Sequence, residues 1–388
     1  MLAAQLSIKN KNNMLDLSGF VKNDELVIDK ENWSYIKENY EKDVVKQAIS
    51  DIIKDLPLPM QKITYQDAIN DFNKLVELDS QSLMCEGEWF TRYPCDYLSS
   101  DKYIEINKIG NQFSNYFQQK NRWKADSINA PSPERTWNTE KFRLTLLNGL
   151  WTQKTKEINN QTLRSCIALR KYIAAQFRPS AAKAIYEYFG AKNILDSSSG
   201  WADRLCGFMA SEGPQHYCGV DPNTNLINGY NSQYQTYLDI VGNNAKTAKK
   251  YEHHVAAFED LKLQYENYFC LMFSSCPYFL VEKYSADSSQ SCHRYKKLDD
   301  WIEKFLYVYL KNSWKALKVG GHLALNISNV YMHHRINDLC NPANKYIKEV
   351  LGGEYIETIG YKMSKRPNSK SDNKGVFCEP IFIWQKVK

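Results

Sequence analysis

The strongest constraint on the fold of this chain is an alternation of short apolar runs and longer amphipathic segments from about residue 163 onward. The runs have the length of buried strands, and the segments between them carry apolar residues at helical spacing. Strands that alternate with helices form a mostly parallel sheet covered on both faces. The sequence therefore predicts an α/β fold, a Rossmann-like doubly wound sheet, with strands at Asn193–Asp196, His216–Asp221, His253–Val255, Tyr268–Phe273 and His322–Ile327 and helices at Leu163–Phe177, Ser180–Phe189, Trp201–Ser211, Asn225–Leu238 and Asp300–Leu317.

Two more apolar runs close the chain, at Tyr355–Met363 and Phe377–Gln385. The polar and basic segment Ser364–Lys374 separates them. Consecutive strands without an intervening helix pair antiparallel, so we expect a carboxyl-terminal hairpin that adds an antiparallel edge to the sheet.

The first 160 residues follow a different pattern. Helical spacing of apolar residues spans Asn32–Lys54 and Thr64–Leu78, and Thr64 with Asp67 is typical of a helix-capping pair. Residues 80–139 contain scattered prolines and predict irregular structure around short helices. We therefore expect a largely helical and irregular amino-terminal region, residues 1–160, with target recognition as a possible role, followed by a catalytic domain, residues 161–388.

The segment Asn111–Lys124 interleaves aromatic residues with lysine and arginine. Bases stack on aromatic rings and phosphates attract basic side chains, so such a strip is one candidate for nucleic-acid contact. An amphipathic helix with buried aromatics and solvated charges accounts for the same pattern, and we favour it.

Composition narrows the class of protein. The chain has 388 residues, 43% of them hydrophobic, which is ample for two globular domains. Its ten cysteines form no Cys-x-x-Cys pair, and adjacent histidines point apart, so no metal site is expected. No apolar run is long enough to cross a membrane and no signal peptide is evident, which places the protein in the cytoplasm or the nucleoplasm of a host cell. The net charge of +6 permits a polyanionic partner without demanding one.

The first strand–turn–helix carries the signs of a nucleotide site. Asp196 ends the strand, the run Ser197–Ser199 follows, and Gly200 lets the backbone approach a ligand before the helix begins. Asp221 ends the second strand, where a carboxylate can bind the hydroxyls of a ribose. A pyrophosphate-binding G-x-G-x-x-G motif is absent, which favours S-adenosylmethionine over a dinucleotide and methyl transfer over hydride transfer.

The pair Glu259 and Asp260 follows the third strand. These carboxylates are candidates for bordering the adenine of the cofactor. They are equally candidates for an acidic pair at a helix amino terminus, where negative charge is stabilised.

Four ordered motifs carry a resemblance to a known family: Phe177-Arg178-Pro179-Ser180, then Asp196 through Gly200-Trp201 to Asp203-Arg204, then Gly219-x-Asp221-Pro222, then Ser275-x-Pro277-Tyr278. The region from Phe177 to Lys388, including the closing run Cys378–Trp384, resembles the S-adenosylmethionine-dependent DNA methyltransferase-like proteins of phages and large DNA viruses. These are similar to amino-methyltransferases that act on adenine N6 or cytosine N4.

The resemblance implies cofactor-binding roles for a set of residues. Phe177 and Pro179 would wall the methionine end, and Asp221 with Pro222 would take the ribose side. Ala202 departs from the glycine usual after the tryptophan. The remaining residues implied in the cradle are Asp196, Ser198, Gly200, Trp201 and Asp203.

The resemblance also implies an acceptor site in the turn after the strand Tyr268–Phe273. Ser275 would accept a hydrogen bond from the amine, together with the carbonyl of Cys276. Pro277 would stiffen the turn, and Tyr278 would stack on an unpaired base. The implied activity is methylation of an exocyclic base amine, with adenine N6 favoured over other amines and DNA favoured over RNA.

Cys276 stands where the family usually has a proline. It is a tolerated change, a sign of a different substrate or lost activity, or a nucleophile of the kind that attacks pyrimidine rings. Two alternatives to base methylation therefore stay open: methylation of a protein or small molecule, and an inactive methyltransferase-like binding subunit. The expected partner is DNA or RNA, with no membrane and no metal, and the sequence gives no oligomeric state.

Overall fold

The computed structural model describes residues 15–99, 101–128, 130–170, 173–242, 248–364 and 375–388. Contacts divide these residues into two compact units. The first unit holds the described residues up to Lys62 together with Arg122–Ala174. The second holds Ile63–Asn121 and Ala175–Lys388. The units are therefore interleaved along the chain, whereas the sequence predicted one boundary between residues 160 and 161.

The first unit is helical and has its own apolar core. Its core side chains include Trp33, Ile49, Trp137 and Leu146, all almost fully buried. Asp29 caps the first helix by accepting a hydrogen bond from the backbone N–H of Asn32 at 2.9 Å. Its elements are α1 (Lys30–Asn39), α2 (Lys42–Ile53), α5 (Pro133–Asn138), α6 (Glu140–Thr152), α7 (Asn160–Arg170), and the short strands β1 (Val21–Lys22), β2 (Glu25–Leu26) and β6 (Asp126–Ser127).

The second unit is built on a ten-stranded mixed sheet within the described residues, in the order β3-β5-β15-β16-β12-β10-β7-β8-β9, with β4 paired to β16. Its centre, β12-β10-β7-β8-β9, is parallel. The strands are β3 (Met84–Glu86), β4 (Trp89–Phe90), β5 (Lys102–Ile104), β7 (Asn193–Asp196), β8 (His216–Val220), β9 (Lys250–His254), β10 (Phe269–Ser275), β12 (Leu317–Asn326), β15 (Glu354–Lys362) and β16 (Val376–Gln385). The predicted doubly wound sheet with a terminal antiparallel hairpin is confirmed.

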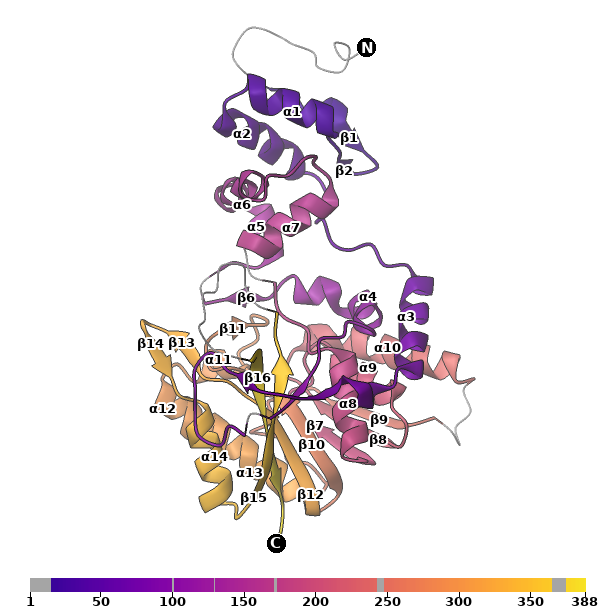
Figure 1. Ribbon diagram of the computed structural model, residues 1–388, viewed down its shortest axis with the longest axis vertical. Coiled ribbons are helices and arrows are strands. Elements are labelled where there is room, and N and C mark those ends of the chain that lie inside the picture. The colour runs from indigo at the N-terminus through magenta and orange to yellow at the C-terminus, as the bar shows by residue number, and fades with distance from the viewer. Residues whose placement is uncertain (1–14, 100, 129, 171–172, 243–247, 365–374) are drawn as a thin grey trace. The chain divides into compact units, whose positions relative to one another are not determined.

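Helices cover both faces of this sheet (Figure 1), which explains why β10 is apolar on both sides. On one face, Tyr186 of α8 contacts Phe273 at 5.8 Å between ring centroids, and Phe208 of α9 contacts Tyr217 at 5.3 Å. The helices of the unit are α3 (Tyr65–Glu77), α4 (Asn111–Arg122), α8 (Pro179–Tyr188), α9 (Asp203–Ala210), α10 (Ile227–Ile240), α11 (Ser291–Arg294), α12 (Leu298–Trp301), α13 (Tyr307–Ala316) and α14 (Cys340–Glu349). Two short strands, β13 (Val330–Met332) and β14 (Arg335–Asn337), form a hairpin.

Residues 63–121 belong to the sheet unit for identifiable reasons. The buried Nζ of Lys183 in α8 donates to the carbonyl oxygens of Leu75, Val76 and Leu78 at 2.8 to 3.0 Å. These are carbonyls that the end of α3 leaves unpaired, so one lysine both caps α3 and fixes it to the sheet. The short strands β3 and β5 then extend the sheet beyond β15.

Several expected elements have different bounds. The helix expected over Leu163–Phe177 is shorter, because α7 ends at Arg170 and α8 begins at Pro179. The expected capping pair of Thr64 and Asp67 is confirmed as a full capping box. The helix expected over Asp300–Leu317 contains a π-helical stretch, Ile302–Leu306, between α12 and α13. The predicted polar segment Ser364–Lys374 lies outside the described residues except for its first residue.

The aromatic and basic strip Asn111–Lys124 is largely helix α4. Phe113 is fully buried and packs on Phe72 at 4.6 Å between ring centroids, and Trp123 is 2% exposed. The favoured interpretation, an amphipathic helix with core aromatics, is therefore confirmed for Phe113. Trp123 follows the end of α4 and is buried in the core of the first unit, and Tyr116 is 42% exposed. Among the described residues, no helix is both long and apolar enough to span a membrane.

Candidate active site

The residues singled out from the sequence gather at the carboxyl ends of three neighbouring parallel strands, β10, β7 and β8. Asp196 ends β7, Asp221 follows β8, and Ser275 ends β10. Carboxyl ends of parallel strands lie on one edge of the sheet, and ligands of such folds bind beyond that edge. The topology thus brings together the two halves of the site, which are about eighty residues apart in the sequence.

Asp196 organises this edge from a fully buried position. Arg204 donates to its two oxygens at 2.8 and 3.1 Å, Tyr217 donates its hydroxyl at 2.6 Å, and the Ser274 hydroxyl donates at 2.9 Å. These bonds occupy the carboxylate. Asp196 therefore holds the loop that follows it, and its side chain has a supporting role.

The loop Ser197–Trp201 turns sharply before α9. The Ser198 N–H donates to the Ser274 hydroxyl at 3.0 Å, which ties the loop to β10. Gly200 has a φ of 57°, and a side chain added there would meet only the Ser198 carbonyl oxygen, at 3.9 Å. Ala202 also takes a left-handed φ, 63°, which explains why a glycine would suit that position. The backbone is therefore open to an approaching ligand at Gly200.

Asp221 faces this loop from the end of β8. Its carboxylate accepts the Gly200 N–H at 3.0 Å and the Asn223 N–H at 2.9 Å. Burial is the main reason that the pKa of Asp221 rises to about 6, with a smaller contribution from the like charge of Asp196. Asp221 and the adjoining Pro222 both keep part of their surface exposed. A carboxylate so placed has remaining lone pairs for hydroxyl donors.

Phe177 lies at the other side of the Asp196 network. Its ring stacks on Tyr361 at 4.6 Å, meets Phe273 edge-on at 5.2 Å, and lies under the Arg204 guanidinium at 5.3 Å. Pro179 is buried at the start of α8 beside Gly110, so it has a packing role. Asp203 opens α9 and accepts a hydrogen bond from the Gln176 amide at 2.9 Å.

Glu259 and Asp260 lie in a turn, and no helix begins there, so the interpretation as a helix-terminal acidic pair is wrong. Arg294 donates to Glu259 at 2.8 Å and to both oxygens of Asp260 at 2.7 and 3.2 Å. Both carboxylates thus share one guanidinium. Their predicted place beside the adenine of a cofactor stays a prediction.

Ser275 at the end of β10 and Tyr278 in the turn that follows are both partly exposed. The Tyr278 hydroxyl donates to Asn326 Oδ1 at 3.3 Å and to Glu379 Oε2 at 3.4 Å. Ser275 pairs in register with Asn326 on β12. Cys276 is 2% exposed, and burial raises the pKa of its thiol to about 12. A thiol with that pKa is protonated at neutral pH, which argues against its role as a nucleophile.

Ser275 and Tyr278 belong to a larger group of polar residues, which we call the acceptor cluster. Its members are Ser275, Tyr278, Glu282, Tyr284, Asn326 and Glu379. Burial, followed by the charge of Glu282, raises the pKa of Glu379 to about 7, and burial raises the pKa of Glu282. The Tyr284 hydroxyl donates to Glu282. The Tyr284 ring also meets Trp201 of the loop at 5.6 Å, which links the acceptor cluster to the Asp221 side.

Glu379 and Asn326 were missed as site residues by sequence reasoning. Each stands inside or at the end of an apolar strand, β16 and β12, where a polar side chain is unusual. A polar residue within an apolar strand is therefore the sequence signal by which these two residues could have been found. Nothing in the sequence, however, indicates that β12 pairs with β10 and that β16 pairs with β12.

No protein-family model matches the chain, and no relative is found among curated proteins. Solved structures with a similar arrangement include the tRNA methyltransferase TrmI of Aquifex aeolicus, at 11% identity over 55% of this chain and 71% of that one, with a TM-score of 0.35. An S-adenosylmethionine-dependent O-methyltransferase of Thermotoga maritima matches at 12% over 57% and 71%, with a TM-score of 0.34. An rRNA methylase of Streptococcus thermophilus matches at 14% over 55% and 100%, with a TM-score of 0.32. Likenesses this distant carry no functional assignment.

Proposed function

We propose that the second unit binds S-adenosylmethionine and transfers its methyl group to an exocyclic amine of a nucleic-acid base, with adenine N6 and DNA favoured. The observation that carries the proposal is the link between the open turn at Gly200 with Asp221 and the acceptor cluster, made by the contact of Trp201 with Tyr284. A cofactor cradle and an acceptor turn so joined are what direct methyl transfer requires.

The residues at the Asp221 side fit the cofactor. The carboxylate of Asp221 is partly exposed and has lone pairs beyond its two backbone donors. The glycine conformation leaves the backbone uncovered beside it. When bound, S-adenosylmethionine would supply an electrophilic methyl group. Asp221 would hold the ribose hydroxyls, and Phe177 would border the methionine end.

The acceptor cluster supplies the groups that an amine acceptor needs. The lone pair of an aromatic amine is delocalised into its ring, and hydrogen-bond acceptors placed around the N–H groups localise it. Ser275 and the Cys276 carbonyl would take that role. S-adenosylmethionine would supply the methyl group, and the amine would release one proton on methylation. The Glu379 carboxylate would accept that proton.

Calorimetry is the first test of this function. The full-length chain is expected to bind S-adenosylmethionine and its demethylated product S-adenosylhomocysteine at one site. A heat of binding that is absent for both compounds would reject the proposal and leave the binding-subunit interpretation.

Ser275→Ala is expected to lower kcat about 100-fold, because it removes a hydrogen-bond acceptor that acts on the amine as charge develops. Cofactor affinity measured by calorimetry should remain unchanged, since Ser275 lies on the acceptor side. The matched control is Ser289→Ala, outside the acceptor cluster, where the Ser289 hydroxyl bonds only locally to Asp287. Wild-type turnover by Ser275→Ala would rule out the proposed role of this hydroxyl.

The pH dependence of the reaction should report Glu379. Its pKa is raised to about 7 by burial and by Glu282, with Arg178 opposing and the Tyr278 hydroxyl bonded to it. Only the ionised carboxylate accepts a proton, so at saturating cofactor kcat/KM for the acceptor should fall as the pH decreases through about 7. Glu379→Gln should lower the rate and flatten this profile. A Glu379→Gln variant that keeps the wild-type profile would assign the titration to another group.

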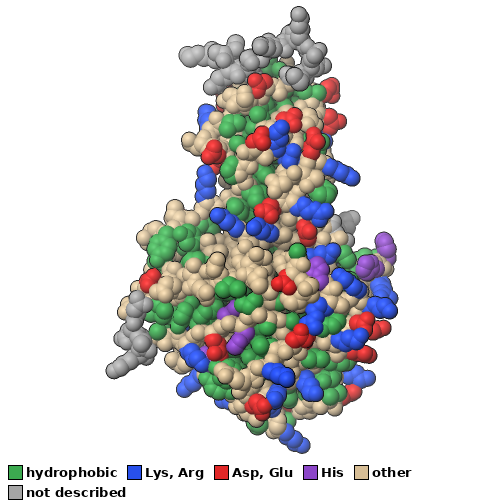
Figure 2. Space-filling model, turned by 180° about the vertical axis from the view of Figure 1, so that it is seen from behind, with side chains coloured by type: hydrophobic (Ala, Val, Ile, Leu, Met, Phe, Trp, Pro, Cys, Tyr) green, Lys and Arg blue, Asp and Glu red, His purple; other side chains and the backbone are tan. Residues whose placement is uncertain are grey.

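A second candidate function is methylation of a protein or small molecule. It rests on two carboxyl groups of the acceptor cluster, Glu282 and Glu379. Within the described residues, Glu282 and Glu379 form no ion pair with a basic side chain, which would also suit a cationic amine of a protein or small molecule. On the face of the second unit seen in Figure 2, lysine and arginine are interspersed with aspartate and glutamate. Competition between DNA and a basic protein as acceptors separates the two functions.

A further inference from the structure

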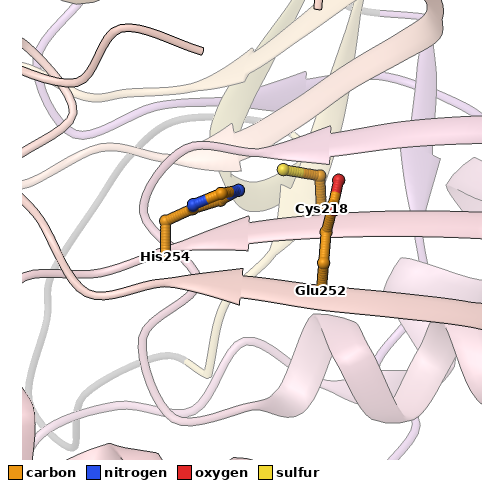
Figure 3. Close-up of side chains that lie close together, drawn as sticks. All are labelled: Cys218, Glu252 and His254. Atoms are coloured by element: carbon orange, nitrogen blue, oxygen red, sulfur yellow. The ribbon is translucent and has the colours of Figure 1, made fainter. Parts of the chain in front are cut away.

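The outer strands β8 and β9 bring together three side chains that the proposed methyl transfer does not use. Cys218 and Glu252 are direct partners in the β8–β9 register, and His254 lies two residues further along β9. Residues two apart on a strand share a face, so all three side chains lie on the same side of the sheet. Their sulfur, oxygen and nitrogen atoms all lie within 4.8 Å of one another, and Figure 3 shows the three side chains close together above the two strands.

His254 has an unsatisfied group at this place. Its Nε2 atom is buried, and within the part of the chain that the structure describes it has no hydrogen-bond partner. A buried ring nitrogen without a partner costs free energy, and such a nitrogen calls for a ligand. The adjacent His253 lies on the opposite face, with its ring 4.2 Å from that of Tyr230, so it does not belong to this group.

Glu252 is held in place by hydrogen bonds to residues beside it on the same face of the sheet. Its Oε1 is hydrogen-bonded to His216 Nε2 at 3.0 Å, and His216 Nδ1 is bonded to the Tyr268 hydroxyl at 3.0 Å. Lys250 approaches the other carboxylate oxygen at 3.8 Å from a largely exposed position. A carboxylate whose orientation is fixed by outer hydrogen bonds is the usual arrangement around protein metal ligands.

We propose that Cys218, Glu252 and His254 bind a divalent transition-metal ion, with Zn²⁺ the best match to a sulfur, an oxygen and a nitrogen donor. Ligand atoms around a zinc ion lie about 3.5 Å apart. Side-chain rotations that move the three ligand atoms by about 1 Å would bring them to that separation. The Cys218 thiol would release its proton to solvent as the metal–sulfur bond forms. Three protein ligands leave one position for water.

The metal would act as a clip between β8 and the edge strand β9. The backbone N–H of Asp221 donates to the His254 carbonyl oxygen at 3.1 Å. The proposed metal ligand His254 is therefore hydrogen-bonded to the residue proposed to hold the ribose. No metal was expected from the sequence, because its ten cysteines form no Cys-x-x-Cys pair and its adjacent histidines point apart. The three ligands become neighbours only through strand pairing. This inference does not depend on methyl transfer.

Cobalt titration of the full-length chain tests the site. Co²⁺ bound to a thiolate gives a charge-transfer absorption band, which should appear and saturate at one equivalent. Cys218→Ser should abolish the band, and His254→Gln should weaken Co²⁺ binding at least ~10-fold. Cys166→Ser, a buried cysteine of the other unit, is the matched control and should keep the wild-type band.

Zn²⁺ should displace Co²⁺ from this site, and it should raise the melting temperature of the wild type but not that of His254→Gln. Absence of the cobalt band in the wild type, or a band that persists in Cys218→Ser, would overturn the proposal. If Cys218→Ser does not fold, as judged by circular dichroism, the cobalt affinities of His254→Gln and Glu252→Gln test the site instead. Wild-type cobalt affinity in both of these variants would then reject the site.

Discussion

Replacing Asp196 by alanine is expected to destabilise the second unit by about 3–5 kcal/mol. Asp196 is fully buried and accepts hydrogen bonds from Arg204, Tyr217 and Ser274. Its removal leaves the Arg204 guanidinium, 5% exposed, without a counter-charge. An uncompensated buried charge is among the costliest single defects in a protein. Urea denaturation, with unfolding free energies extrapolated to water, measures the loss.

Asp260→Ala is the matched control for Asp196→Ala. Its carboxylate is 61% exposed and also pairs with an arginine, Arg294, so its loss should change stability by less than about 1 kcal/mol. The double variant Asp196→Ala/Arg204→Met should be tolerated better than Asp196→Ala, because it removes both charges of the buried pair. Equal stability of Asp196→Ala and Asp260→Ala would contradict the supporting role given to Asp196.

Replacing Asp221 by alanine is expected to weaken S-adenosylmethionine binding at least ~100-fold, because hydrogen bonds to a charged group contribute about 1.5–3 kcal/mol each. The same change removes the acceptor for the Gly200 and Asn223 N–H groups, which shape the turn. Calorimetry with the cofactor measures the affinity. Methyl transfer should fall with cofactor occupancy and recover in part at high cofactor concentration.

The pH dependence of cofactor binding gives an independent check on Asp221. Burial raises its pKa to about 6, so the ionised form predominates only above that pH. Ribose hydroxyls donate to the ionised form more strongly, so cofactor affinity should fall as the pH decreases through about 6. Asp221→Asn should bind more weakly than the wild type and lose this dependence. Retention of tight binding by Asp221→Ala would remove Asp221 from the cofactor site.

The sheet could be predicted because its strands are continuous apolar runs set between helices of regular spacing. The runs at β7, β8, β10 and the second half of β12 are largely buried on both faces and therefore stand out in the sequence. The strands β3, β4 and β5 have only two or three residues each and carry no such pattern. Residues 63–121 join the sheet through tertiary contacts such as those of Lys183, which local periodicity does not contain.

The site could be predicted only where its residues adjoin a recognisable motif. Asp221, Gly200 and the Ser275–Tyr278 turn follow strands directly, so their place at one edge of the sheet follows from topology. Glu379 reaches Tyr278 from a hundred residues away, through the pairing of β16 with β12. The engagement of Asp196 by Arg204 likewise depends on side-chain geometry. Its buried carboxylate serves as a support, a role that spacing alone does not distinguish from ligand contact.

Transfer of a tritium-labelled methyl group from S-adenosylmethionine to DNA, RNA and total protein, by the full-length chain, tests the central claim most directly. We expect label in nucleic acid, recovered as an N-methylated base and lost in Ser275→Ala. Label found only in protein would support methyl transfer but would identify a protein, in place of nucleic acid, as the acceptor. Binding of the cofactor without transfer to any of the three acceptors would contradict the proposed reaction.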